Sequence, residues 1–171
     1  TLDVLFTEVL RSTGGPLVAP DKINRVAMAT RLTLAPGDCK HQAFNVIGHR
    51  YATLIVHGPC PPLDLSVAHR QTRYPLDVTG GFSCDDDTLL QIHRMCLNTQ
   101  RNCMLDAYVD TPWREQAQWW GDARILAWNT FHLADDTRLF RLGIRQIGDS
   151  NQALPNGLTY GHAPTGEVTE G

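Results

Sequence analysis

The side chains best suited to chemistry are concentrated in residues 110–122, which read DTPWREQAQWWGD. Three carboxylates, one arginine and three of the four tryptophans fall within this short segment. Pro112 disfavours a helix, so we predict a loop over 110–121 that leads into a helix beginning at Asp122. Loops held between rigid elements often carry binding and catalytic groups. The segment is therefore the candidate functional site.

This combination of side chains suits a sugar. Carboxylates and an arginine can hydrogen-bond vicinal hydroxyls, and indole faces can cover the C–H face of a pyranose ring. A carboxyl beside indole loses solvation, which raises its pKa and lets it act as a general acid near neutrality. A structural alternative stays open on the residues alone, with Arg114 paired to Glu115 or Asp110 and the tryptophans in the core. Spacing does not separate the two interpretations.

The chain on either side of this loop shows two hydrophobic patterns. Before Gly80-Gly81, short alternating or β-branched segments are separated by Pro/Gly turns, which is typical of an antiparallel sandwich. The predicted strands cover 5–10, 25–34, 44–56 and 65–74.

After Gly81 the spacing of apolar residues approaches 3.6. A first helix, capped by Ser83 or Asp85, is predicted to run to about Leu105. Its apolar stripe is Leu89, Ile92, Cys96, Thr99 and Cys103. Two further helices are predicted over 122–134 and 136–147, and 148–171 reads as loop.

Composition excludes several kinds of partner. The 171 residues are 42% hydrophobic and 19% charged, as in an ordinary folded protein. Fifteen basic against 18 acidic residues give a net charge of −3, so no positive field attracts nucleic acid or an anionic membrane. No apolar run approaches the roughly 18–20 residues that span a bilayer. We expect neither a nucleic-acid nor a membrane partner.

Cysteines and histidines give no sign of a metal site. The five cysteines are odd in number and lack a C-x-x-C pair, which predicts buried free thiols and slightly favours the cytoplasm, while the compartment stays unknown. The seven histidines lack zinc-ligand spacing. We expect no metal and no cofactor.

The loop strongly resembles the signature of bacterial α-L-rhamnosidases, approximately D-C-P-x-R-E-x-x-x-W-x-G-D. Three further stretches resemble the same family in the same order: FNVIGHRY at 44–51, GFSCD at 81–85, and DSNQ with PNGL within 149–158. The resemblance runs from about residue 25 to residue 164. It implies a mixed fold, β then α: an antiparallel β-sandwich segment at 1–81, then the first helices of an incomplete (α/α) six-hairpin barrel at 82–171.

The resemblance also implies roles for individual residues. Glu115 falls on the family's general acid, which protonates the departing glycosidic oxygen. The groups that hold the rhamnose hydroxyls correspond to Asp110, Arg114 and Asp122, and Trp119 falls on an aromatic lining the pocket.

The sequence departs from the family pattern at two positions of the loop. Thr111 replaces a frequent cysteine that has no assigned chemical role, and Trp120 stands where a small or polar residue is common. Trp120 therefore either narrows the pocket or belongs to the core. We expect Trp113 and Trp128 to be core residues.

The implied activity is removal of terminal α-L-rhamnose by an inverting acid/base mechanism. That mechanism needs a second carboxylate, about 6.5–9.5 Å from the acid, and in this family it lies in the second half of the barrel. Only 90 residues follow Gly81, room for about three helices. We therefore expect a fragment that carries only the acid half-site and is inactive alone, with the remainder of the parent polypeptide and a rhamnose-containing glycoside as its partners.

The fragment interpretation leads to one further expectation, about the surface of the helices. Leu89, Ile92, Ile125, Leu139 and Phe140 should contribute to a large exposed apolar surface. The alternatives to a rhamnosidase are a non-catalytic carbohydrate-binding or structural fragment, and a six-hairpin glycosidase for another sugar.

Overall fold

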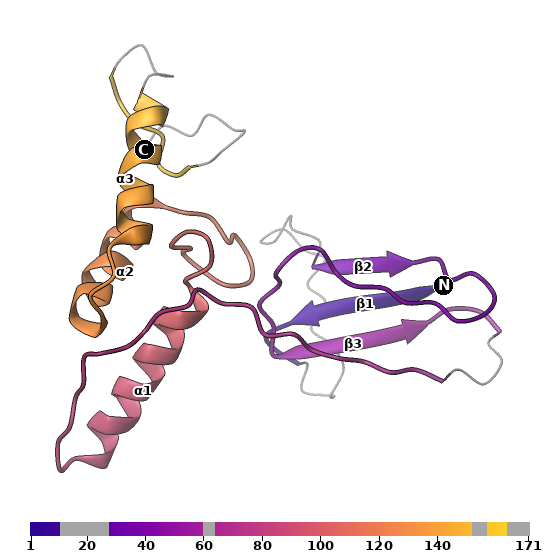
Figure 1. The fold of residues 1–171 in the computed structure, drawn as a ribbon. Coiled ribbons are helices and arrows are strands. Elements are labelled where there is room, and N and C mark those ends of the chain that lie inside the picture. Colours follow the sequence, from indigo (N-terminus) through magenta and orange to yellow (C-terminus); the bar gives the residue numbers. More distant parts are fainter. Residues whose placement is uncertain (11–27, 60–63, 152–156, 164–171) are drawn as a thin grey trace. The chain divides into compact units, whose positions relative to one another are not determined.

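The computed structural model describes residues 1–10, 28–59, 64–151 and 157–163. The chain divides into two compact units, 1–71 and 72–171, which are treated separately below. The first unit is a sheet and the second is helical (Figure 1). The domain boundary that we placed between residues 81 and 82 stays a prediction.

The first unit is a three-stranded antiparallel sheet with the order β2-β1-β3 (Figure 1). Its strands are β1 (Leu2–Thr7), β2 (Ala29–Leu32) and β3 (Tyr51–Val56). The carboxylate of Asp3 on β1 accepts from Arg31 at 2.7 and 2.8 Å and contacts His57 Nε2 at 2.7 Å. The hydrogen bond from Arg31, followed by that from His57, lowers the pKa of Asp3.

Several strand predictions were wrong in extent. β1 begins three residues earlier than predicted, and within 44–56 only 51–56 is a strand. The predicted strand at 65–74 is absent, because no neighbouring strand pairs with it in the part of the chain that the structure describes. Of the prediction at 25–34, residues 29–32 are β2 and residues 25–27 lie outside the described residues. A small sheet is present, but a sandwich is not shown.

The second unit holds three helices, α1 (Asp87–Asn102), α2 (Trp120–Leu133) and α3 (Arg138–Asn151). The cap of α1 is Asp86, not Ser83 or Asp85, because its Oδ1 accepts from the Thr88 and Leu89 amides at 2.8 and 3.2 Å. α1 also ends before Leu105, at Asn102. α3 continues four residues beyond 147, into a segment predicted as loop.

The core of the helical unit is a small apolar cluster that joins α2 and α3 to the segment after α1. Its buried members are Met104, Tyr108, Ala123, Ala127 and Leu139. A buried polar network lies beside it. Thr130 Oγ1 accepts from Tyr108 Oη at 2.9 Å and from Gln100 Nε2 at 3.1 Å, and it donates to the Leu126 carbonyl at 2.9 Å. The network ties α1 and the segment after it to α2.

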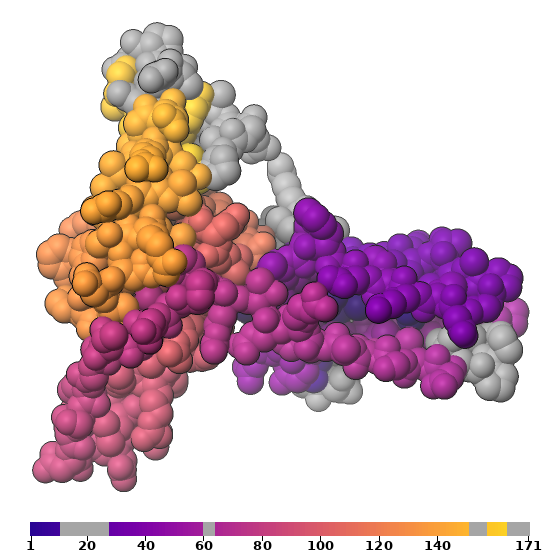
Figure 2. All heavy atoms as spheres, in the orientation of Figure 1, coloured from indigo at the N-terminus to yellow at the C-terminus, as the bar shows by residue number. Residues whose placement is uncertain are grey.

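Four of the five apolar side chains expected at the surface of the helices are exposed. Leu89, Ile92, Ile125 and Phe140 are exposed, and Figure 2 shows atoms of α1 and α3 at the surface of the unit. Leu139 was predicted wrongly: it is only 5% exposed because it packs in the core cluster.

Other burial predictions need correction. Trp128 is 65% exposed, because α2 turns Ala123, Ala127 and Thr130 inward instead. The predicted stripe of α1 is exposed apart from Cys103, since Gln100 is the buried residue of that helix.

The expectation of buried thiols holds for Cys103 but was wrong for Cys39 and Cys96, which are exposed. Cys84 is half-buried, and Cys60 lies outside the described residues. Within the described ranges, no three His, Cys, Asp or Glu side chains are grouped to hold a metal ion. The same ranges contain no helix long and apolar enough to cross a membrane.

Candidate active site

The loop before α2 is closed by its first acidic residue. The Asp110 amide donates to the Ala117 carbonyl, and Asp110 Oδ1 accepts from the Ala117 amide, both at 2.9 Å. Gln116 has a φ of 51°, in the left-handed region, so the chain reverses next to this closure. The predicted loop is confirmed, although α2 begins at Trp120, two residues before Asp122.

The structure brings Glu115, Arg114 and Trp119 into direct contact. Arg114 Nη2 donates to Glu115 Oε1, and Trp119 Nε1 donates to Glu115 Oε2 at 3.1 Å. The Glu115 side chain is 37% exposed, so the desolvation by indole that we expected is not found. The Arg114–Glu115 pair of the structural alternative is present together with the indole contact. Each carboxylate oxygen of Glu115 thus has its own donor.

The other two candidate carboxylates lie around the thiol of Cys103. Its Sγ donates to the Asp110 carbonyl at 3.8 Å. Burial raises the pKa of the Cys103 thiol, and the charges of Asp110 and Asp122 raise it further. Asp122 is exposed in the first turn of α2, where a carboxylate is also favoured by the helix dipole. Among the described residues, no hydrogen bond joins Glu115 to either aspartate.

The remaining tryptophans of the loop serve different purposes. Trp120 donates through Nε1 to the Tyr160 carbonyl, and its amide donates to the Gly161 carbonyl at 3.0 Å. Trp120 thus attaches a distant segment to the start of α2. Trp113 is half-buried, and its indole nitrogen is buried with no hydrogen-bond partner in the described part of the chain.

Sequence reasoning missed two residues that join the loop to distant parts of the chain, His162 outside the loop and Gln118 within it. The ring of His162 lies 4.4 Å from the Trp119 ring, centroid to centroid, with an interplanar angle of 39°. Gln118 is buried and donates through Nε2 to Gln146 Oε1 at 2.6 Å and to the Ala163 carbonyl at 3.1 Å. The only sequence signal that pointed to the segment carrying His162 was the family resemblance, which extends to about residue 164. Residues 148–171 show no hydrophobic periodicity from which a contact could be predicted.

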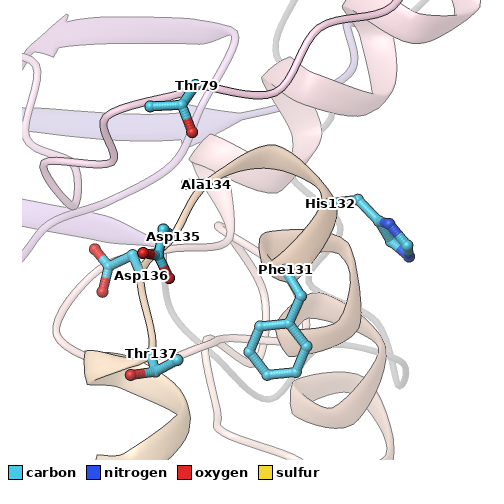
Figure 3. A pocket seen from close by; sticks show the side chains of 7 residues that line it. All are labelled: Thr79, Phe131, His132, Ala134, Asp135, Asp136 and Thr137. Carbon is cyan, nitrogen blue, oxygen red and sulfur yellow. The ribbon is translucent and has the colours of Figure 1, made fainter.

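A separate hollow of about 280 Å³ lies where α2 turns into α3 (Figure 3). None of the predicted site residues lines it. Its Asp136 is already engaged, because Oδ2 accepts from Tyr74 Oη at 2.8 Å and from Arg138 Nη2 at 2.7 Å. Burial, followed by the hydrogen bond to Asp136, raises the pKa of Tyr74 to about 12. We therefore assign the hydrogen bonds of Asp136 with Tyr74 and Arg138 a role in the stability of the helical unit.

Comparison with known proteins defines the class to which this helical unit belongs. Residues 77–171 match the model of the six-hairpin glycosidase domain of bacterial α-L-rhamnosidases, which includes the whole candidate site. The chain therefore belongs to the bacterial α-L-rhamnosidase family. No curated protein and no solved structure matches it. The expected fold is confirmed as a small antiparallel sheet followed by three helices, which form only part of a six-hairpin barrel.

Proposed function

We propose that this chain supplies the acid half-site of an inverting α-L-rhamnosidase, with Glu115 as the general acid. The observation that carries the proposal is the position of Glu115 between Arg114 and Trp119, inside the matched glycosidase domain. The substrate is a glycoside with terminal α-L-rhamnose. Arg114, Asp110 and Asp122 hold its hydroxyls, and Trp119 covers its apolar face.

The hydrogen bonds of Glu115 indicate which oxygen faces the leaving group. A bond from a charged guanidinium is stronger than one from a neutral indole, so Arg114 keeps Oε1 as an acceptor. Oε2 is therefore the oxygen that carries the proton to the glycosidic oxygen. The Trp119 indole stays beside Oε2 and holds it in place, and the face of the indole covers the sugar ring.

The two aspartates can bind hydroxyls without breaking the loop. One oxygen of Asp110 closes the loop onto Ala117, and Oδ2 has no hydrogen-bond partner among the described residues. Asp122 is exposed at the start of α2. The general base is assigned to none of the described carboxylates, so we expect the isolated chain to hydrolyse rhamnosides negligibly. The exposed apolar side chains of the helices support contact with the remainder of a barrel.

The test is Glu115→Gln in the protein encoded by the open reading frame that contains this chain. The amide keeps the shape of the side chain but delivers no proton. We expect kcat to fall about 10²–10⁴-fold on a rhamnoside with a poor leaving group, and much less on an activated aryl rhamnoside. Asp106→Asn is the matched control, because Asp106 is also an exposed acidic loop residue but has no proposed role.

Asp110→Asn and Asp122→Asn should instead weaken binding and turnover together. In Asp110→Asn the side-chain amide oxygen can still accept from the Ala117 amide, so a loss there reports on the free oxygen rather than on loop closure. If Glu115→Gln left turnover near wild type while Asp122→Asn abolished it, the acid would be Asp122. Rhamnose binding without hydrolysis by the wild-type protein would favour the non-catalytic alternative.

A further inference from the structure

We propose that His162 is a positioning residue, which holds the Trp119 indole against Glu115 and so fixes the direction of the acid side chain. The inference rests on the proposed function of Glu115. It concerns a residue 43 positions beyond Trp119, in a stretch without a recognisable secondary-structure pattern.

The segment that carries His162 is attached to the loop by backbone and side-chain contacts. Trp119 and His162 form an antiparallel bridge. On one side of it, the Trp120 amide donates to the Gly161 carbonyl at 3.0 Å. On the other side, Gln118 donates to the Ala163 carbonyl at 3.1 Å. Because contacts flank it on both sides, His162 has a fixed position relative to the loop.

Trp119 needs such a support because its backbone and side chain are held in different ways. As the N-cap of α2 it has extended angles, φ −68° and ψ 133°, and its carbonyl accepts from the Ala123 amide at 2.8 Å. Its side chain makes no capping hydrogen bond. The indole is therefore oriented by its hydrogen bond to Glu115 and by the His162 ring. Removing the ring leaves a single hydrogen bond between two partly exposed side chains.

Loss of the His162 ring affects Glu115 Oε2 indirectly, through the Trp119 indole. The indole defines the place of Glu115 Oε2, the oxygen to which we assign the transferred proton. Without the His162 ring, the indole occupies other rotamers, and only the neighbouring Arg114 still directs the carboxylate. Because the energy of one aromatic pair limits the size of the effect, we expect loss of the ring to lower kcat roughly two- to tenfold.

The first readout is independent of activity and uses the 171-residue chain. The indole N–H resonance of Trp119 is assigned by ¹⁵N NMR, and Glu115→Gln is expected to shift it. His162→Ala should shift and broaden the same resonance, whereas His162→Phe, which keeps a ring, should restore it. His132→Ala is the matched control, because it removes another histidine–tryptophan contact, with Trp128 at 6.3 Å. His162→Leu fills similar space without a ring and should behave like His162→Ala if the latter folds poorly.

The second readout is kinetic and uses the product of the open reading frame. His162→Ala should lower kcat on poor leaving groups about two- to tenfold, with KM and the activated substrate little changed, and His162→Phe should recover it. An unchanged Trp119 resonance in both His162→Ala and His162→Leu would overturn the proposal. So would an equal kinetic loss in His162→Phe. If the resonance responds as expected while Glu115→Gln keeps full activity, the positioning contact stands and the proposed function fails.

Discussion

Thr130 offers the sharpest test of how the helical unit holds the site. Its hydroxyl accepts from Tyr108 Oη and Gln100 Nε2 and donates to the Leu126 carbonyl, all within 3.1 Å. Thr130→Val keeps the shape of the side chain and removes the hydroxyl. Gln100 retains its bond to the Leu126 carbonyl at 2.8 Å, whereas Tyr108 loses the acceptor of its hydroxyl.

The expected loss follows from that one orphaned donor. A buried polar group left unsatisfied costs about 1–3 kcal/mol, and Tyr108 is 2% exposed, so water cannot replace the threonine. Thr130→Val should therefore lower the free energy of unfolding by about 1–3 kcal/mol. Urea unfolding followed by tryptophan fluorescence measures it specifically, because all four tryptophans belong to the helical unit.

Tyr108→Phe provides the control for this reasoning. It removes the donor itself, so Thr130→Val added to Tyr108→Phe should cost less than the sum of the two single changes. A loss below about 0.5 kcal/mol for Thr130→Val, or strictly additive losses, would show that the network does not support the unit.

Two further predictions test the positions around the α2–α3 turn. Gly80→Ala places a Cβ 2.3 Å from the His132 carbonyl oxygen, so it should lower the free energy of unfolding by about 1–3 kcal/mol. The neighbouring Gly81→Ala is the control and should cost less than about 0.5 kcal/mol, because its Cβ meets no atom within 4 Å. Urea unfolding compares the two variants, and equal losses would refute the contact at Gly80. The hydrogen bond from Arg138 holds the pKa of Asp136 below its ordinary 3.8, so the stability it contributes is present above that pH and is lost as the pH falls below it. Asp136→Asn should flatten the dependence of unfolding free energy on pH between about 5 and 2, and an unchanged slope would contradict this assignment.

The helices could be predicted because each has local signals. Pro112 marks the loop, and acidic residues precede α1 and α3 closely enough to place their starts within a few residues. The exact caps could not be predicted, since several neighbouring acids compete for the same role. The strands were harder to predict, because a strand depends on a partner distant in sequence. Residues 65–74 have suitable composition but no pairing strand among the described residues.

The candidate site was predictable in composition but not in its contacts. The pattern around Glu115 identified the residues, and adjacency made the Arg114 pair one of two alternatives. Spacing could not indicate that the Trp119 indole donates to Glu115, because that depends on rotamers. Nor could it indicate His162, which reaches the loop through an isolated bridge without periodicity. The exposure of Glu115 also differs from expectation, because the Trp120 indole is directed to the Tyr160 carbonyl instead of covering the carboxylate.

The start of α2 explains why the loop and the distant segment belong together. Tryptophan is a poor N-cap, and replacing a good cap typically costs a helix about 1 kcal/mol. Trp119 makes no capping bond, yet the first amide of the helix is satisfied, because Trp120 donates to the Gly161 carbonyl. The segment at 160–163 thus supplies an acceptor for one amide of the first turn, and the side chain at the N-cap position contacts Glu115. An unfavourable N-cap residue whose helix start is supported by a contact from elsewhere in the chain is typical of a functional site.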